Sequence, residues 1–346
     1  MWSAKLADKP FVYSIFGIQY PTGNPTSVQE ALTEEFDSLI SGHGTHIERL
    51  IQDGCATPSA GKSHVWIAYW TSSEEYQKWW TRDDVSQFWA SLPSDAGMWR
   101  EVLTPSPRRS QYGANKNEPS GLGNLGERFD IGRKSGYWGC YRHRLADHTS
   151  DEMVSSAKQD LEPRRPLSKL SAGISSPEIR PGRVHMTHFP NNICFVVEGQ
   201  DHSAITTEEK KLWVENFDES VSRWMKDLME AGPESGILDR RMCYERDSGL
   251  FLEGEPQALR YNKKVQLFYF KDLRHFEKIG RQNKGHVDLR KRFLEAYGSD
   301  GHMMNGNLSL WVETTVLKAD EMDCEYVGCV DGTGFMAFSS DLDNFA

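Results

Sequence analysis

The sequence predicts an α+β fold made of two ferredoxin-like units in one chain, arranged like a dimeric α+β barrel. Each half of the chain has the same order of elements: a strand, a long helix, a strand, two short helices and a strand. Residues also recur at a constant offset of 200, since Val65, Tyr69, Trp70, Tyr76 and Lys78 correspond to Val265, Tyr269, Phe270, Phe276 and Lys278. An antiparallel sheet backed by helices in each half accounts for both observations.

The expected strands of the first half are rich in β-branched and aromatic residues. They cover residues 11–20, 65–70 and 98–103. A helix is expected over 26–42, because apolar residues recur there at helical spacing and a capping box precedes them. Two short helices follow, one starting at 72 and one over 85–89.

The second half is expected to repeat this plan. Strands are predicted over 193–198, 241–245, 265–270 and 308–316, and the longest helix of the chain over 206–231. A helix from 273 and the helix that carries His286 come between the last two strands.

Long polar segments separate the two halves. Residues 104–135 are rich in Pro, Gly, Ser and Asn, which predicts a surface connection. The chain is therefore divided into a first unit over 1–110 and a second unit over 191–335. Connecting loops over 111–190, with a strand near 136–144, lie between them. An acidic tail over 336–346 follows, and we expect it to be solvated.

Composition narrows the classes of function. The 346 residues carry a net charge of −10 and no long basic run, which argues against a nucleic-acid partner. No segment is apolar enough to be a signal peptide or a membrane span, and the six cysteines include no CxxC pair. A cytoplasmic protein with no membrane partner is therefore expected.

One histidine heads an apolar stripe. Read as a helix, the stretch after Lys284 places His286 on the same side as Leu289, Phe293, Leu294 and Tyr297. The ordinary interpretation is a core or capping histidine. The alternative is a proximal haem ligand, which requires one neutral imidazole presented to an apolar slot.

Several short motifs, taken in order, carry a family resemblance. They are Gly136-Tyr-Trp-Gly-x-x-Arg142-x-Arg144, Asn192-Ile-x-Phe195-x-x-x-Gly199-Gln200, the helical His286, Leu310-Trp-x-Glu313 and Thr333-Gly-Phe335. In order and spacing they resemble the motifs of haem-containing aldoxime dehydratases, from about residue 11 to 335. The resemblance implies two ferredoxin-like units, haem b held by one histidine on the C-terminal unit, and dehydration of an aldoxime to a nitrile.

The resemblance also implies roles for individual residues. His286 is similar to the proximal ligand of ferrous haem, and Arg144 to the distal arginine that helps to hold the substrate. An open axial position then binds the nitrogen of an N–O compound. Val312, Val196 and Phe293 are expected to line the pocket.

The distal residues depart from the family pattern. Glu198 stands where relatives carry a hydroxyl residue, and Val312 stands where they carry a histidine. Glu198 is expected to share a strand face with Cys194 and Val196. It is either a structural carboxylate that pairs with Arg144 or reaches solvent, or a general acid or base over the haem. Burial would raise its pKa and a nearby guanidinium would lower it.

Three functions remain open. The first is a haem lyase acting on an aldoxime. The second is a haem enzyme of the same scaffold that activates an N-hydroxylated amine or amino acid, for example for N–N bond formation, because a carboxylate suits an amine-bearing substrate. The third is a non-catalytic haem sensor. A homodimer is expected by analogy with other ferredoxin-like haem proteins.

Overall fold

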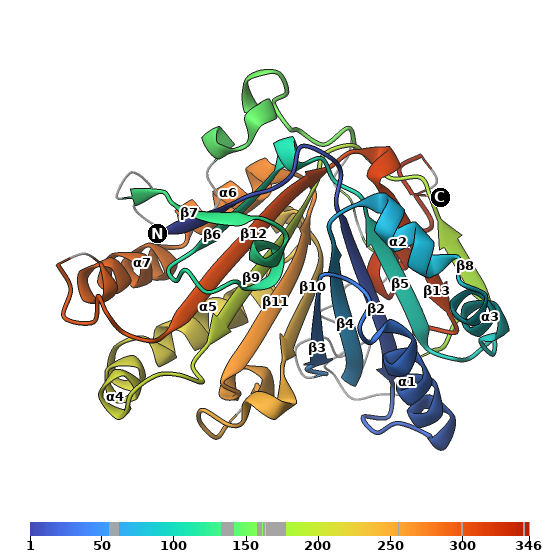
Figure 1. Ribbon diagram of the computed structural model, residues 1–346, viewed down its shortest axis with the longest axis horizontal. Coiled ribbons are helices and arrows are strands. Elements are labelled where there is room, and N and C mark those ends of the chain that lie inside the picture. Colours follow the sequence, from blue (N-terminus) through green and yellow to red (C-terminus); the bar gives the residue numbers. More distant parts are fainter. Residues whose placement is uncertain are drawn as a thin grey trace.

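The strands form one continuous curved sheet with helices on its outer side (Figure 1). The computed structural model describes residues 1–54, 62–132, 142–157, 161, 163, 178–254, 256–298, 300–341 and 343–345. Within these residues the sheet is 13-stranded, in the order β7-β1-β6-β12-β9-β11-β10-β3-β4-β2-β5-β13-β8. Every pairing between neighbouring strands is antiparallel.

Each half of the chain contributes four adjacent strands in the same relative order. The first-half strands are β2 (Val12–Tyr20), β3 (His46–Gln52), β4 (Lys62–Trp70) and β5 (Met98–Leu103), and the second-half strands are β9 (Ile193–Asp201), β10 (Ile237–Tyr244), β11 (Lys263–Phe270) and β12 (Ser309–Leu317). In both halves the first strand lies between the third and the fourth. The two halves join where β3 pairs with β10.

Helices follow these strands at matching places. In the first half they are α1 (Ser27–Ile40), α2 (Ser73–Trp80) and α3 (Asp83–Ser91), and in the second half α4 (Thr207–Asn216), α5 (Asp218–Glu230), α6 (Leu273–Gln282) and α7 (Lys284–Tyr297). None of the helices in the described part of the chain is both long and apolar enough to cross a membrane.

Within the described ranges, five further strands extend the sheet beyond the repeated plan. They are β1 (Trp2–Lys5), β6 (Ser110–Ala114), β7 (Glu127–Asp130), β8 (Arg183–Met186) and β13 (Met322–Val327). The expected surface connection over 104–135 is therefore wrong in part, because β6 pairs with β12 and is buried throughout. A strand this short has too few residues for its alternation to stand out from a polar sequence.

Three other expectations about local structure need correction. The single helix over 206–231 is two helices, because Phe217 leaves helical geometry and packs its ring 5.3 Å from that of Trp213. The segment at 336–346 is not a solvated tail, since Phe345 is fully buried and stacks 5.1 Å from Phe338. Of the predicted strand at 136–144, residues 136–141 lie outside the described residues, and Arg142–Arg144 forms a short 3₁₀ helix.

The core has three apolar layers. One layer lies between the two halves of the sheet, where the rings of Tyr13 on β2 and Phe195 on β9 are 5.3 Å apart. The other two lie between each half of the sheet and its own helices. Contact between β2 and β9 across this layer requires the sheet to curve back on itself, as Figure 1 shows.

Two buried glutamates cross-link the halves in the shared layer. Glu313 on β12 accepts hydrogen bonds from Tyr13 at 3.1 Å and Tyr69 at 3.2 Å, both in the first half. Glu101 on β5 accepts one from Tyr269 in the second half at 2.9 Å, and Arg241 approaches it at 2.6 Å. Each of these carboxyl groups therefore takes side-chain partners from the opposite half. Tyr69 and Tyr269 occupy repeat-related positions.

Glu313 should make stability depend on pH. Burial raises the pKa of Glu313 to about 8, although hydrogen bonds from Leu122, Tyr13 and Tyr69 oppose the shift. The folded state then binds more protons at this site than the unfolded chain, whose glutamate has a pKa near 4.5. Protonated Glu313 therefore makes its whole contribution to the free energy of unfolding below about pH 4.5. As the pH rises from there toward about 8, this contribution decreases by about 1.4 kcal/mol for each pH unit.

Denaturant unfolding of the wild-type protein and of Glu313→Gln between pH 5 and 8 measures this contribution. The difference in unfolding free energy should shift in favour of the variant as the pH rises. Glu35→Gln, which alters an exposed side chain, serves as the control. A difference that stays constant over this range would contradict the assignment.

Candidate active site

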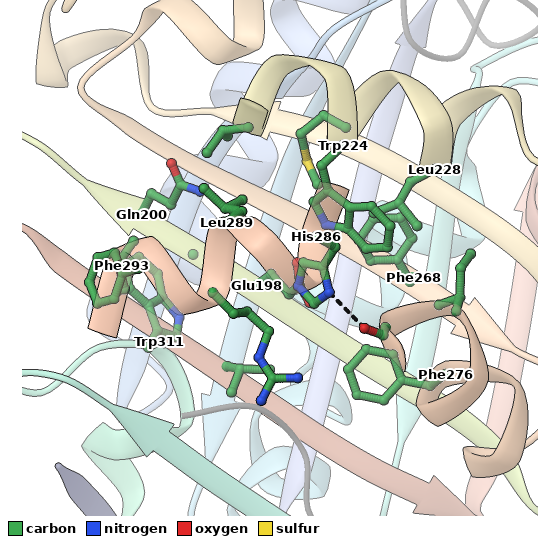
Figure 2. Close-up of a pocket in the computed structure, with 18 of the residues that line it drawn as sticks. Glu198, Gln200, Trp224, Leu228, Phe268, Phe276, His286, Leu289, Phe293 and Trp311 are labelled. Atoms are coloured by element: carbon green, nitrogen blue, oxygen red, sulfur yellow. Dashed lines mark hydrogen bonds between the residues drawn. The ribbon is translucent and has the colours of Figure 1, made fainter. Parts of the chain in front are cut away.

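A cavity lies in the second half of the molecule, between the sheet and the helices that cover it (Figure 2). Its open space, including the mouth, is about 1260 Å³. The walls are mostly apolar and aromatic, which is typical of sites for organic ligands. The sheet contributes Glu198, Gly199, Gln200, Phe268, Phe270, Leu310, Trp311 and Val312, and the helices contribute Trp213, Val221, Trp224, Met225, Leu228, Phe276, Glu277, Ile279, Gly280, Arg281, His286, Leu289, Arg290 and Phe293.

The turn between α6 and α7 positions His286. Asn283 ends α6 and caps α7, because its side-chain oxygen accepts a hydrogen bond from the His286 backbone N–H at 2.9 Å. This cap places His286 in the first turn of α7 with its ring directed into the cavity (Figure 2).

Two contacts fix the His286 ring. Its Nδ1 lies 2.8 Å from the carbonyl oxygen of Gly280, drawn as the dashed line in Figure 2. Because a carbonyl only accepts, Nδ1 carries the proton and Nε2 keeps its lone pair. The indole of Trp224 stacks on the imidazole at 4.4 Å with an interplanar angle of 18°. A metal-binding histidine needs this kind of support, which sets both its tautomer and its orientation.

The environment keeps this imidazole neutral. Burial lowers the pKa of His286 below its ordinary value, and the charge of Arg290, one helical turn later, lowers it further. The hydrogen bond to Gly280 acts in the opposite direction. The neutral form is the one that binds iron or another transition metal.

Glu198 lies on the opposite wall of the cavity. It is on β9, flanked by Val312 on β12 and Gln266 on β11, and Figure 2 shows it on the sheet behind His286. Among the residues that the structure describes, none forms a hydrogen bond or ion pair with its carboxyl group. Burial is the cause that raises the pKa of Glu198 to about 7. The group can therefore give or take a proton near neutral pH.

The structure brings four of the six predicted site residues together. His286, Glu198, Val312 and Phe293 line the same cavity. Arg144, at the end of the 3₁₀ helix Arg142–Arg144, is half-buried and is not among the lining residues.

The remaining predictions concern which way side chains face. Val196 faces the helices with Cys194 and Glu198, as alternation along β9 requires, but it is fully covered and does not line the cavity. Leu294 was expected on the His286 face of α7. Instead it is 40% exposed, because it lies eight residues after His286 and the helical turn carries it outward.

Sequence reasoning missed two contributors to the site. Trp224 lies within the helix predicted over 206–231, and nothing in the local sequence indicates that it stacks on His286. Gln200 follows Glu198 by two residues, so strand alternation alone would have placed it on the same wall.

Comparison with known proteins identifies the class to which this fold and site belong. The family model for "Haem-containing dehydratase" matches residues 14–335. The chain is 24% identical over 334 residues to phenylacetaldoxime dehydratase of Bacillus sp. (strain OxB-1), covering 94% of this chain and 87% of that protein. It is 25% identical over 278 residues to aliphatic aldoxime dehydratase of Rhodococcus globerulus, covering 78% and 70%.

The fold is also similar to a solved structure. An aldoxime dehydratase crystallised with butyraldoxime matches with a TM-score of 0.75 and 18% identity, over 97% of this chain and 88% of that one. The chain belongs to the haem-containing dehydratase family. The resemblance recognised in the sequence and the expected haem cofactor are therefore confirmed.

The residues around the cavity fit such a group. A haem needs an apolar slot, one nitrogen ligand and cations near its carboxylates. The cavity offers aromatic walls, the Nε2 atom of His286, and the arginines Arg281 and Arg290. One buried polar atom on the sheet side, Gln200 Oε1, also has no hydrogen-bond partner among the described residues, so an occupant of the cavity could satisfy it.

His286→Ala should lower haem affinity by removing the ligand atom while leaving the fold intact. The measurements are the Soret band of the purified protein and the rate at which haem passes to an acceptor protein, followed with and without added imidazole, which should partly restore the spectrum. His302→Ala, an exposed histidine, is the control. A variant that keeps the native spectrum and release rate would remove His286 as the ligand.

Proposed function

We propose that this chain is a haem-dependent lyase that converts an aldoxime to a nitrile and water. The proposal rests on two residues that face each other across one apolar cavity. His286 is neutral and has an available Nε2 atom. Glu198 can be protonated, and its carboxyl group has no partner in the described part of the chain. The family supports the reaction class, since its relatives include dehydratases named for aldoximes.

The proposed cofactor is haem b, held by His286 in the second unit, residues 191–335. When bound there in the ferrous state, it supplies an iron atom that accepts the substrate nitrogen and electron density that weakens the N–O bond. The matching strand order of the two halves supports the interpretation as two ferredoxin-like units.

Glu198 would handle both protons of the reaction. Its carboxyl group donates a proton to the departing oxygen, so that water leaves instead of hydroxide. The resulting carboxylate then accepts the proton from the oxime carbon as the C≡N bond forms. The two transfers balance, and Glu198 returns to its acid form.

The apolar walls would support this chemistry. Phe268, Phe276 and Leu289 line the cavity that holds the carboxyl group and would limit the water around it once a ligand fills the mouth. A water-poor cavity keeps the pKa of Glu198 raised and prevents proton exchange with solvent during the reaction. Trp224 and Gly280 hold the imidazole in one orientation throughout.

A second candidate is activation of an N-hydroxylated amine on the same scaffold. It is favoured by the absence of a cation paired with Glu198 among the described residues, because an ammonium group of the substrate would supply the missing counter-charge. Anaerobic, dithionite-reduced enzyme that forms nitrile from phenylacetaldoxime or butyraldoxime supports the first candidate. No nitrile from any aldoxime, together with spectral binding of N-hydroxylated amines, supports the second.

Glu198→Gln tests the proton-transfer role. Because the amide has nearly the same shape but cannot donate the acidic proton, kcat should fall by about 100- to 10,000-fold. The Soret band and the spectral dissociation constant for the aldoxime should change little. Glu295→Gln, an exposed position on α7, provides the matched control. Turnover that survives in Glu198→Gln would return Glu198 to a structural role.

The pH profile offers an independent test. Since the carboxyl must be protonated to act first as an acid, kcat/KM should be level well below its pKa of about 7 and fall about tenfold per pH unit above it. The profile is measured as initial rates of nitrile formation between pH 5.5 and 9. A rate that rises through pH 7 would indicate that Glu198 acts as an anion, as the second candidate requires.

A further inference from the structure

Gln200 lies on the same wall of the cavity as Glu198. Both are on β9, two residues apart, and both line the cavity (Figure 2). Because side chains two apart on a strand point the same way, the amide lies about 7 Å along the strand from the carboxyl group. A substrate whose reacting end lies at Glu198 can therefore reach Gln200 with its far end.

The side-chain oxygen of Gln200 has no hydrogen-bond partner within the described part of the chain. This Oε1 atom is buried, and no described residue donates a hydrogen bond to it. A buried acceptor without a donor is unfavourable, and native proteins rarely leave one unless an occupant supplies the donor.

The neighbouring side chains do not supply that donor. Across the sheet, Gln200 is opposite Lys264 on β11 and Leu310 on β12. The Lys264 amino group already donates to the carbonyl oxygens of Leu259 at 3.0 Å and Tyr261 at 3.2 Å. Leu310 has no polar side-chain atom, so neither cross-strand neighbour supplies the donor.

Two of the α7 side chains that line the cavity with Gln200 are apolar. Leu289 and Phe293 on α7 line the cavity, and Figure 2 labels both among the side chains around it. A directed acceptor beside apolar side chains discriminates strongly, because a ligand without the donor leaves the acceptor unpaired.

We propose that Gln200 determines substrate specificity by accepting a hydrogen bond from an O–H or N–H group at the far end of the substrate. The inference rests on the proposed function, since it takes the N–O end of the substrate to lie at Glu198. The substrate class is then an aldoxime whose chain ends in a hydroxyl or amino group, and not a plain alkyl or aryl aldoxime.

Three substrates of nearly equal size test this proposal. They are 5-hydroxypentanal oxime, 5-aminopentanal oxime and hexanal oxime, which differ only in the terminal group. Spectral dissociation constants are measured on the haem-loaded enzyme by titration of the Soret band, and kcat/KM is measured for nitrile formation. The wild-type enzyme should favour a donor-bearing oxime over hexanal oxime by about tenfold or more in both quantities.

Two variants at the same position separate the roles of the amide. Gln200→Leu should reduce the preference to about onefold and leave the Soret band and haem release unchanged. Gln200→Glu, which keeps an acceptor of the same length, should retain the preference and increase it for the amino compound. Glu295→Gln again controls for a surface change.

The outcomes distinguish this inference from the proposed function. If no oxime gives nitrile, the proposed reaction fails, yet the dissociation constants still show whether Gln200 selects a donor. Equal dissociation constants for the three oximes in the wild-type enzyme would overturn the inference, as would a preference that survives in Gln200→Leu. Faster haem release from Gln200→Leu would also overturn it, because the amide would then hold the cofactor.

Discussion

The rest of the structure depends on one constraint: each half of the sheet buries one of its faces against the other half of the sheet. The shared layer contains aromatic rings from both halves and two glutamates that could not remain there unpaired. Glu313 accepts hydrogen bonds from Tyr13 and Tyr69 of the first half. Glu101 accepts hydrogen bonds from Tyr269 and Arg241 of the second half. These hydrogen bonds to the two glutamates hold the two halves in one register. The other face of each half packs against the helices of that half.

The two outer layers are filled differently, and this difference creates the site. In the first half, Phe16, Phe36, Trp79 and Trp89 pack closely between sheet and helices, and the Trp79 indole also donates to the carbonyl of Leu39 at 3.0 Å. In the second half the corresponding space stays open beside His286. A repeated scaffold therefore carries the His286 cavity in one of its two outer layers.

Two polar side chains in the cavity of the second half have groups without a hydrogen-bond partner among the described residues. Glu198 and Gln200 face the cavity from β9, and neither the Glu198 carboxyl group nor the Gln200 Oε1 atom is paired within the described residues. Such groups reduce stability in an empty apolar cavity, and they become favourable when an occupant completes their hydrogen bonds. His286 is different because its ring is already fixed by Gly280 and Trp224 before any ligand binds.

The sequence did not predict β3 (His46–Gln52), but by itself it determined the other seven strands of the two halves and the helical position of His286. These follow from local periodicity and residue identity. Only the tertiary structure decided that Glu198 is half-buried in the cavity wall without a described partner, that Arg144 does not line the cavity, and that Trp224 stacks on His286. It also decided that Phe217 divides one predicted helix and that Phe345 enters the core. Contacts between residues far apart in the chain set each of these features, because burial and pairing depend on what packs from other elements and not on the pattern of neighbours in sequence.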